Sequence, residues 1–495
     1  MLSLIVFLPL VGVLLCALVP KRFDFLAKYI ALTVTLANFG LAAAMLILHG
    51  PSSGGREGIL LEKSFAWIPQ INVNYHIGLD GLSFPLIVLS TLLFTLAVIA
   101  SWKIDVKPRL YFSMLCLLSL GLNGVFAALD LVLFYVFWEI VLVPMFFLIS
   151  KWGGARRRYA AMKFFLYTFL GSVFMLVGIV ALYLMTGTFN MLELREMAPV
   201  IFAGDGSLWS TQWWIFLAFF LALAVKVPIF PLHTWLPDAH VQAPTAASVL
   251  LAGVMLKMGT YAFLRISVPI LTDAFQTWQL TLGILGVISI IYGAIVAFAQ
   301  KDIKKLVAYS SVSHMGFAMV AIASGTATGF NAAMAVNISH GLTTSMLFFM
   351  VGMIYERTRT LKIAELSGIA AQMPRLAGFF CFAAFASMGL PLLSGFVGEF
   401  LTILASWESP VLPPIITILS GIGILLGGAY MLWLLQRSIF GEPSALVEGQ
   451  KDINLREITV LAPLAVLVLA IGVYWHLLLQ YTDPFATALA RILGA

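Results

Sequence analysis

Residues 212–237 read QWWIFLAFFLALAVKVPIFPLHTWLP, and this stretch decides the class of fold. A long apolar run leads into a lysine and then into three prolines. Proline removes a backbone donor and clashes with the preceding helical turn, so the run indicates a helix that is broken part-way. A second stretch, 389–399, reads GLPLLSGFVGE and has the same character. In lipid such breaks survive only where the freed carbonyl groups face protein or water, so we predict two broken membrane helices.

The composition of the chain supports a membrane protein. Of 495 residues, 61% are apolar and 10% are charged, and the mean hydropathy is +1.03. A soluble domain is about 45–50% apolar and about 25% charged, so the composition excludes a soluble enzyme, a nucleic-acid-binding protein and a disordered chain. The three cysteines, Cys16, Cys116 and Cys381, lie far apart in apolar runs. We therefore expect neither iron–sulfur nor zinc ligation, and no metal or cofactor site in this chain.

Long apolar runs recur along the whole chain. A spanning helix needs about 20 mostly apolar residues. We predict an all-α polytopic membrane protein with about 14 transmembrane helices. Their expected ranges are 2–19, 28–48, 79–101, 110–128, 131–150, 160–185, 212–235, 243–266, 276–298, 303–324, 330–355, 375–405, 412–437 and 458–479.

Lysine and arginine in the connections predict how the helices insert, because cytoplasmic loops carry an excess of both. Of the 28 such residues, 21 fall in odd-numbered connections and five in even-numbered connections and the termini. This asymmetry predicts an even number of spans with both termini on the outer, periplasmic side. It also explains the net charge of +6 as a basic inner rim.

Two outer connections are long enough to fold by themselves. Within 49–78, the alternation of Ile71, Val73 and Tyr75 predicts a small β-hairpin. The connection 186–211 is expected to hold a short surface helix near Leu192–Met197. We assign no chemistry to either segment.

The two broken helices occupy equivalent positions in two successive blocks of five spans. Spans 4–8 and spans 9–13 each contain five helices, with the broken helix in fourth place. Because five is odd, consecutive copies insert in opposite orientations, and inverted repeats with paired broken helices are typical of transport proteins. We divide the chain into an N-terminal three-helix segment (1–109), a first repeat (110–266), an inverted second repeat (267–437) and a C-terminal loop with the last transmembrane helix (438–495). The alternative is that the prolines merely kink long helices.

Four charged side chains remain at depth once the rims are assigned: Glu139, Lys226, Lys257 and Glu399. Each costs about 2.5–3.5 kcal/mol at the bilayer centre, so pairing or water must compensate. Glu139 can pair with Lys226 and switch it between holding and releasing a proton. Lys257 would then pass the proton sideways, and Glu399 would close the path. The alternative is a set of static buried charges that fix the register of the helices.

Two histidines, His314 and His340, lie between Lys257 and Glu399 in sequence order. They could bridge the gap as neutral proton carriers or through ordered water. The alternatives are packing histidines or, less simply, the two ligands of a haem.

Three further polar residues adjoin these helices. His233 and His240 flank the first broken helix and are expected to line its outer end. Asp130 stands at the end of a span and is expected to be a solvated helix cap.

Several stretches resemble the antiporter-like subunits of respiratory complex I, and the resemblance runs over essentially the whole chain. They are 137–145 (FWEIVLVPM), 225–245 (VKVPIFPLHTWLPDAHVQAPT), 251–259 (LAGVMLKMG) and 301–316 (KDIKKLVAYSSVSHMG). Within the family the chain looks most similar to M-type members, the bacterial counterparts of mitochondrial chain 4. Glu399 supports this assignment, because L- and N-type relatives usually carry lysine at the matching place.

The resemblance implies a proton-translocating membrane-arm subunit of NADH:quinone oxidoreductase in the bacterial inner membrane. It assigns Glu139 and Lys226 as the coupled pair, Lys257 as the central relay and Glu399 as the terminal group. His314 and His340 would belong to the hydrated axis between Lys257 and Glu399. FMN, iron–sulfur clusters and quinone would belong to other subunits. The implied partners are those subunits, above all the L- and N-type neighbours, together with membrane lipid and protons, but no nucleic acid.

Two other functions share these features. A subunit of an Mrp-type cation/proton antiporter, or of a membrane-bound hydrogenase, would have the same core. A passive membrane scaffold would use its buried charges only to hold helices together. The proteins that copurify with the chain distinguish an antiporter or hydrogenase subunit from a subunit of complex I. Loss of proton transport in variants of the relay residues would exclude the passive scaffold.

Overall fold

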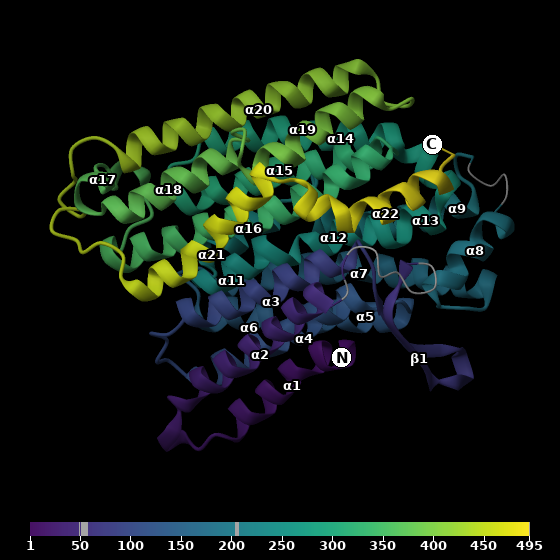
Figure 1. Cartoon of the computed structure of the whole chain (residues 1–495), viewed down its shortest axis with the longest axis horizontal. Helices are drawn as coiled ribbons and strands as arrows, with labels where there is room; N and C mark the ends of the chain where they lie inside the picture. Colours follow the sequence, from purple (N-terminus) through teal and green to yellow (C-terminus); the bar gives the residue numbers. More distant parts are fainter. Residues whose placement is uncertain (49, 51–57, 203–206, 495) are drawn as a thin grey trace.

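The computed structural model describes residues 1–48, 50, 58–202 and 207–494, and nearly all of its regular structure is helical (Figure 1). The first part of the chain contains α1 (Leu2–Leu18), α2 (Leu26–Leu48), β1 (Leu60–Ile68), β2 (Val73–Leu79), α3 (Ser83–Ala100), α4 (Pro108–Ala127), α5 (Leu131–Ile140), α6 (Leu142–Trp152), α7 (Arg157–Thr186), α8 (Met191–Ile201), α9 (Thr211–Lys226) and α10 (Trp235–Gln242). Short 3₁₀ turns lie at η1 (Lys21–Phe23) and η3 (Pro69–Ile71).

The second part of the chain is also helical. It contains α11 (Thr245–Leu250), η4 (Leu251–Met255), α12 (Lys257–Ala262), η5 (Phe263–Ser267), α13 (Val268–Ile270), α14 (Thr272–Phe298), α15 (Ile303–Ala323), α16 (Ala327–Thr358), η6 (Ile363–Glu365), α17 (Ile369–Gln372), α18 (Pro374–Ser387), α19 (Ser394–Glu408), α20 (Pro414–Leu434), η7 (Leu435–Ile439), α21 (Leu455–Val473) and α22 (His476–Ile492). Of the η segments in this part, η4, η5 and η7 are π-helical turns within longer helices, and η6 is a 3₁₀ turn.

Eleven helical segments in the described ranges are long and apolar enough to cross a membrane. The other three expected spans fall on shorter helices. The run 2–19 forms α1, which has 17 residues. The runs 212–235 and 375–405 are each interrupted, so that α9 ends at Lys226 and α18 is separated from α19 by residues 388–393. The chain is therefore a multi-pass membrane protein by composition and helix length.

Both helices are interrupted at the prolines from which the breaks were predicted. Residues 227–234 are not helical and separate α9 from α10. In the second interruption Gly389 has a φ of +72°, a left-handed conformation that glycine adopts without strain. The backbone at both places leaves the helical path next to a buried charged residue.

Three further irregularities were not predicted. The expected span 131–150 is divided at Val141 into α5 and α6, because Pro144 lacks the N–H that would bond to the Ile140 carbonyl. The expected span 243–266 is instead a helix from Thr245 to Ile270 that contains the π turns η4 and η5. Such turns often occur at functional sites, and η4 comes directly before Lys257.

The expected last span, 458–479, extends too far at its C-terminal end. Helix α21 stops at Val473, and a separate amphipathic helix, α22, follows it. Helix α22 packs against α16 and α13, and in Figure 1 it extends toward the end of the molecule where α8 and α9 lie. Polar residues interspersed after His476 give this helix one polar side, which a search for continuous apolar runs cannot recognise.

The two long connections have the predicted structure. Strands β1 and β2 form an antiparallel hairpin in which Phe65 faces Tyr75, and it projects from the helical body (Figure 1). Residues 49 and 51–57 of the same predicted segment lie outside the described residues. The short surface helix expected near Leu192–Met197 is α8.

Asp130 caps α5, but the expectation that it is solvated is wrong. Its side chain is completely buried and accepts hydrogen bonds from the backbone N–H groups of Val132 and Leu133. It also accepts one from Asn74 in β2. The hydrogen bonds of Asp130 therefore link the hairpin to the start of the helix that carries Glu139.

Candidate functional site

Glu139 and Lys226 come from α5 and the end of α9. The Lys226 side chain is 1% exposed, and its Nζ has no hydrogen-bond partner among the described residues. It lies 5.0 Å from the ring centroid of Trp138, the residue before Glu139. No ion pair within 4.0 Å joins Lys226 to Glu139 in the described structure, although the two charges are close enough to interact. Glu139 and Lys226 therefore interact through their charges without forming a close ion pair, and an aromatic ring lies beside the ammonium group.

The carboxylate of Glu139 is only partly satisfied. Its Oε1 is buried and has no partner in the described part of the chain. Hydroxyl groups of Tyr135 and Ser172 interact with this carboxylate. An acceptor that is left free in a buried polar site can bind water or a proton.

Lys257 is completely buried and has two partners. Its Nζ lies 2.5 Å from Nδ1 of His340 on α16. The same Nζ donates to the carbonyl of Ala252 in the π turn η4. The π turn shifts the backbone bonding pattern, and the Ala252 carbonyl becomes available to the lysine that follows it. Neither partner of Lys257 can be recognised from the sequence, and the local backbone supplies one of the two.

A close packing of helices brings Lys257 near the end of α9. Gly259, in the same turn, lies against Val227, and a Cβ at Gly259 would come within 2.5 Å of that side chain. The backbone approach therefore requires glycine at 259. This contact places the segment after Lys226 beside the helix that carries Lys257.

From His340 the polar contacts continue to Glu399. The rings of His340 and His314 have centroids 5.6 Å apart. Nδ1 of His314 lies 3.4 Å from Oε1 of Glu399, and its Nε2 is 3.0 Å from the hydroxyl of Ser387. The structure thus joins four residues predicted from separate helices into one row, which is Lys257, His340, His314 and Glu399.

This geometry bears on the alternatives for the histidines. Nδ1 of each ring already faces another titratable group, Lys257 in one case and Glu399 in the other. Both histidines therefore make specific polar contacts and are more than apolar packing.

The surroundings of Glu399 fix where its carboxylate points. Its Oε2 is buried and without a partner in the described structure. Gly389, from the break before α19, lies so close that an added Cβ would be 2.1 Å from this oxygen. Tyr430 of α20 interacts electrostatically with Glu399, and its buried hydroxyl also interacts with Ser310. The second helix break thus forms one wall of the carboxylate site.

A cavity of about 490 Å³ opens where α3, α6 and α16 end and α15 begins. Ser101, Gln242, Lys304 and Glu356 are among the residues that line it. These connections belong to the set that carries most of the basic residues. The cavity is large enough for several water molecules.

Lys304 and His240 lie between this cavity and the row of polar residues. Lys304 is only 7% exposed, and its Nζ donates to the Ala243 carbonyl at 2.6 Å. His240 is buried, stacks on Phe348, and neither ring nitrogen has a partner among the described residues. The charges of Lys304 and Lys257 both act on His240.

Lys304 is a further buried charged side chain beside the four that are expected at depth. Lys304 follows Lys301 in one of the basic connections, so its place in the sequence does not indicate burial. Its position in the first turn of α15, with an inward-facing side chain, is a tertiary feature. Arg265 is also only 7% exposed. His240 likewise lies toward the basic connections and not, as expected, at the outer end of the broken helix.

The comparison with known proteins decides the family. The family pattern described as "NADH:quinone oxidoreductase/Mrp antiporter, TM" matches residues 128–432. The chain belongs to this family. The pattern described as "NADH-ubiquinone oxidoreductase chain 4, amino terminus" matches residues 59–124. The M-type resemblance is confirmed by these two matches.

Individual relatives agree with the family assignment. The chain is 41% identical to "NADH-quinone oxidoreductase subunit M" of Rhodobacter capsulatus, over 99% of this chain and 96% of the relative. It is similar to a chain of respiratory complex I from Thermus thermophilus, with a TM-score of 0.89, 33% identity and complete coverage of both chains. A chain of the Mrp complex from Dietzia sp. gives a TM-score of 0.83 at 21% identity, covering 100% of this chain and 99% of that one, which shows a shared fold alone.

Proposed function

We propose that this chain is the M-type, proton-translocating membrane subunit of an NADH:quinone oxidoreductase. The observation that carries the proposal is the buried row of contacts Lys257–His340–His314–Glu399. A buried row of three basic side chains that ends at a carboxylate can pass a proton, whereas a static ion pair needs only two members. The family assignment supplies the redox reaction that would drive the transfer.

The route has two ends. Protons enter through the cavity beside Lys304 and reach Lys257 by way of His240. Glu139 and Lys226 act as the coupled pair that biases the charge of Lys257. Protons leave from Glu399, beside the interruption between α18 and α19. The residues in these roles are Glu139, Lys226, Lys257, His340, His314 and Glu399.

The membrane topology is part of the same proposal. The fourteen spans consist of the eleven long helical segments plus α1, α9 with its continuation, and α18 with α19. Segments 110–266 and 267–437 are inverted repeats, flanked by 1–109 and 438–495. Both termini lie on the periplasmic side of the bacterial inner membrane. The proposal is supported by the 21 basic residues of the odd-numbered connections and by the recurrence of the helix break.

The chain is proposed to act without a redox centre of its own. FMN, iron–sulfur clusters and quinone are placed in other subunits of the complex. The L- and N-type antiporter-like subunits are the proposed membrane neighbours, and their cores would repeat the same fold. The name of the relative from Rhodobacter capsulatus supports the assignment to a quinone-reducing complex.

Glu139→Gln and Lys226→Ala test the proposal in the purified complex reconstituted into vesicles. We expect redox-driven proton uptake to fall on the order of tenfold in each variant while the complex still assembles, because positioned proton donors and acceptors contribute at least this much. Glu448→Gln is the matched control, since this exposed carboxylate lies in the connection before α21. Full pumping in both relay variants would contradict the proposal.

Copurification separates the proposed complex from an antiporter. Flavin and iron–sulfur absorbance that copurifies with the chain supports the oxidoreductase. A sodium-dependent assembly without either chromophore would replace it by the Mrp-type function. Assembly of the variants with normal chromophores, together with lost pumping, excludes a passive scaffold.

A further inference from the structure

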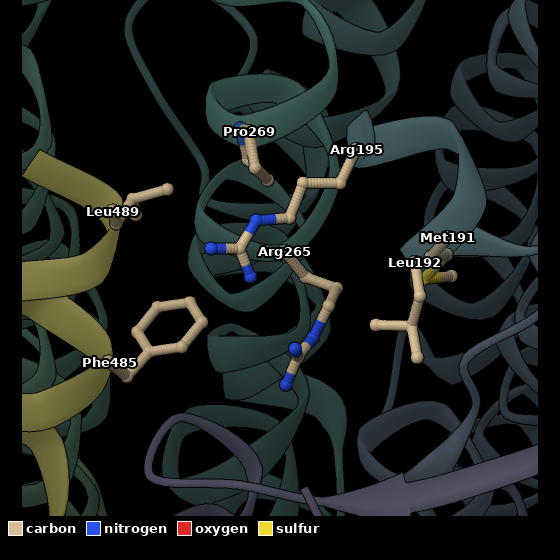
Figure 2. A pocket seen from close by; sticks show the side chains of 7 residues that line it. All are labelled: Met191, Leu192, Arg195, Arg265, Pro269, Phe485 and Leu489. Atoms are coloured by element: carbon tan, nitrogen blue, oxygen red, sulfur yellow. The ribbon is translucent and has the colours of Figure 1, made fainter. Parts of the chain in front are cut away.

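Basic residues are rare in the even-numbered connections and the termini, yet two of the five, Arg195 and Arg265, line the same pocket. Arg195 comes from α8 and Arg265 from η5. Their guanidinium groups lie between Leu192 on one side and Phe485 and Leu489 of α22 on the other (Figure 2). Two cations that share a small site repel each other, so the arrangement needs negative charge.

Arg265 is held rigidly at the base of this pocket. Its Nη2 donates to Oδ1 of Asp80 at 2.5 Å, and its Nε donates to the hydroxyl of Tyr261 at 3.2 Å. Its guanidinium carbon lies 5.4 Å from the ring centroid of Phe485. The Asp80 carboxylate neutralises this one arginine and leaves a preorganised set of donors in the wall of the pocket.

Arg195 has no such partner. It makes no hydrogen bond and no ion pair with any residue in the described part of the chain. Glu193, which is near it in α8, is already bonded to Thr188 and Asn190. One positive charge in the pocket is therefore left without a counter-charge.

The walls of the pocket indicate what kind of anion fits. Helices α8 and α22 are both amphipathic, and their apolar residues Leu192, Phe485 and Leu489 border the guanidinium groups. The free space is about 20 Å³, enough for one or two oxygen atoms but not for a whole enclosed phosphate. A phosphate that inserts its oxygens at the mouth, with an apolar remainder outside, matches both features.

We propose that Arg195 and Arg265 form a binding site for the phosphate group of an anionic phospholipid at the end of the membrane domain. Arginine binds phosphate oxygens through paired N–H donors, and the apolar faces of α8 and α22 would cover the glycerol and upper acyl carbons. The lipid would fasten α22 to α8. The site does not depend on the proton relay, and the two proposals can fail separately.

The test uses the intact complex with a photoactivatable phosphatidylglycerol analogue. Crosslinked peptides from α8 and α22 are quantified by mass spectrometry. We expect Arg195→Gln to reduce labelling of both helices roughly fivefold, because one basic residue near a membrane surface contributes about 1 kcal/mol toward an anionic lipid. Lys63→Gln is the matched control, since it removes another outer basic residue, from β1. Arg195→Lys should retain part of the labelling.

Three results would overturn the proposal. The first is equal labelling of Arg195→Gln and the unaltered protein. The second is equal labelling by a phosphatidylcholine analogue, since this lipid has no net charge. The third is complete loss of labelling in millimolar inorganic phosphate, which would identify a soluble anion as the occupant. Arg195→Lys keeps the test decisive if Arg195→Gln prevents assembly.

Discussion

Nζ of Lys257 lies 2.5 Å from Nδ1 of His340, although 83 positions separate the two residues in the chain. The contact joins α12 to α16 in the interior, and both side chains are at most 4% exposed. Of the two nitrogen atoms one must donate and the other must accept, because both cannot donate along the same line. The two side chains are therefore one hydrogen-bonded unit.

The first prediction concerns this unit. Lys257→Met and His340→Ala should each lower redox-driven proton uptake by at least about tenfold. The double variant should be no slower than the slower single variant, because each change removes the same link. Proton uptake by reconstituted vesicles measures all three. Multiplicative effects would mean that the two residues contribute independently and do not form one unit.

The second prediction concerns the wall beside Glu399. Gly389→Ala places a methyl group within 2.1 Å of Glu399 Oε2 and strains a backbone at a φ of +72°. We expect a destabilisation of about 1–3 kcal/mol and a loss of proton transport, since the carboxylate must move away from His314. The assembled complex should still reduce quinone in detergent.

Gly428→Ala is the control for this change. Gly428 lies within α20, and an added Cβ there meets no atom within 4 Å. Alanine is favoured over glycine in a helix by about 1 kcal/mol, so this variant should be at least as stable as the unaltered protein. If Gly389→Ala also pumps normally, the second helix break does not position Glu399.

Residues that stand alone in an apolar run could be recognised from the sequence. Lys226 and Lys257 interrupt such runs, and prolines mark both helix breaks, so this part of the site was accessible to sequence reasoning. Pro144 could also have predicted the interruption at Val141, because proline affects the carbonyl four residues earlier.

The rest of the site depends on tertiary structure. The π turn at 251–255 contains no proline, and its effect on Lys257 follows from packing against α16. Lys304 stands in a basic connection, where position in the sequence does not reveal depth. The separation of Lys226 from Glu139 by more than an ion-pair distance is likewise set by how α5 and α9 pack.

The third prediction concerns the cavity. Lys304→Gln keeps a donor for the Ala243 carbonyl but removes the charge that acts on His240. We expect proton uptake to fall several-fold, about threefold to tenfold by analogy with other proton donors held in place. Lys305→Gln is the matched control, because the neighbouring side chain is half-buried and makes no side-chain ion pair in the described structure. Equal rates in both variants would place the entrance elsewhere.

The fourth prediction concerns stability and the ion pair between Asp80 and Arg265. Oδ1 of Asp80 accepts hydrogen bonds from Arg265 at 2.5 Å and from the backbone N–H groups of Leu82 and Ser83 at 3.1 Å. Asp80→Asn would leave Arg265 buried without its counter-charge, which costs about 3–5 kcal/mol when one partner of a buried pair is removed. The thermal inactivation rate of the complex at neutral pH measures this loss. Asp105→Asn is the control, because Asp105 is exposed.

The pH dependence of this effect has a definite sign. Burial raises the pKa of Asp80, but the charge and hydrogen bond of Arg265 and the bonds from Ser83 outweigh it and hold the pKa below its ordinary value. Because the folded pKa is depressed, the stabilisation is complete above the pKa of the unfolded state and is lost as pH falls through the folded pKa. The difference between the unaltered protein and Asp80→Asn should therefore stay constant from neutral pH to about pH 4 and shrink below it. A difference that already disappears near pH 6 would show that Asp80 does not carry its charge into the pair.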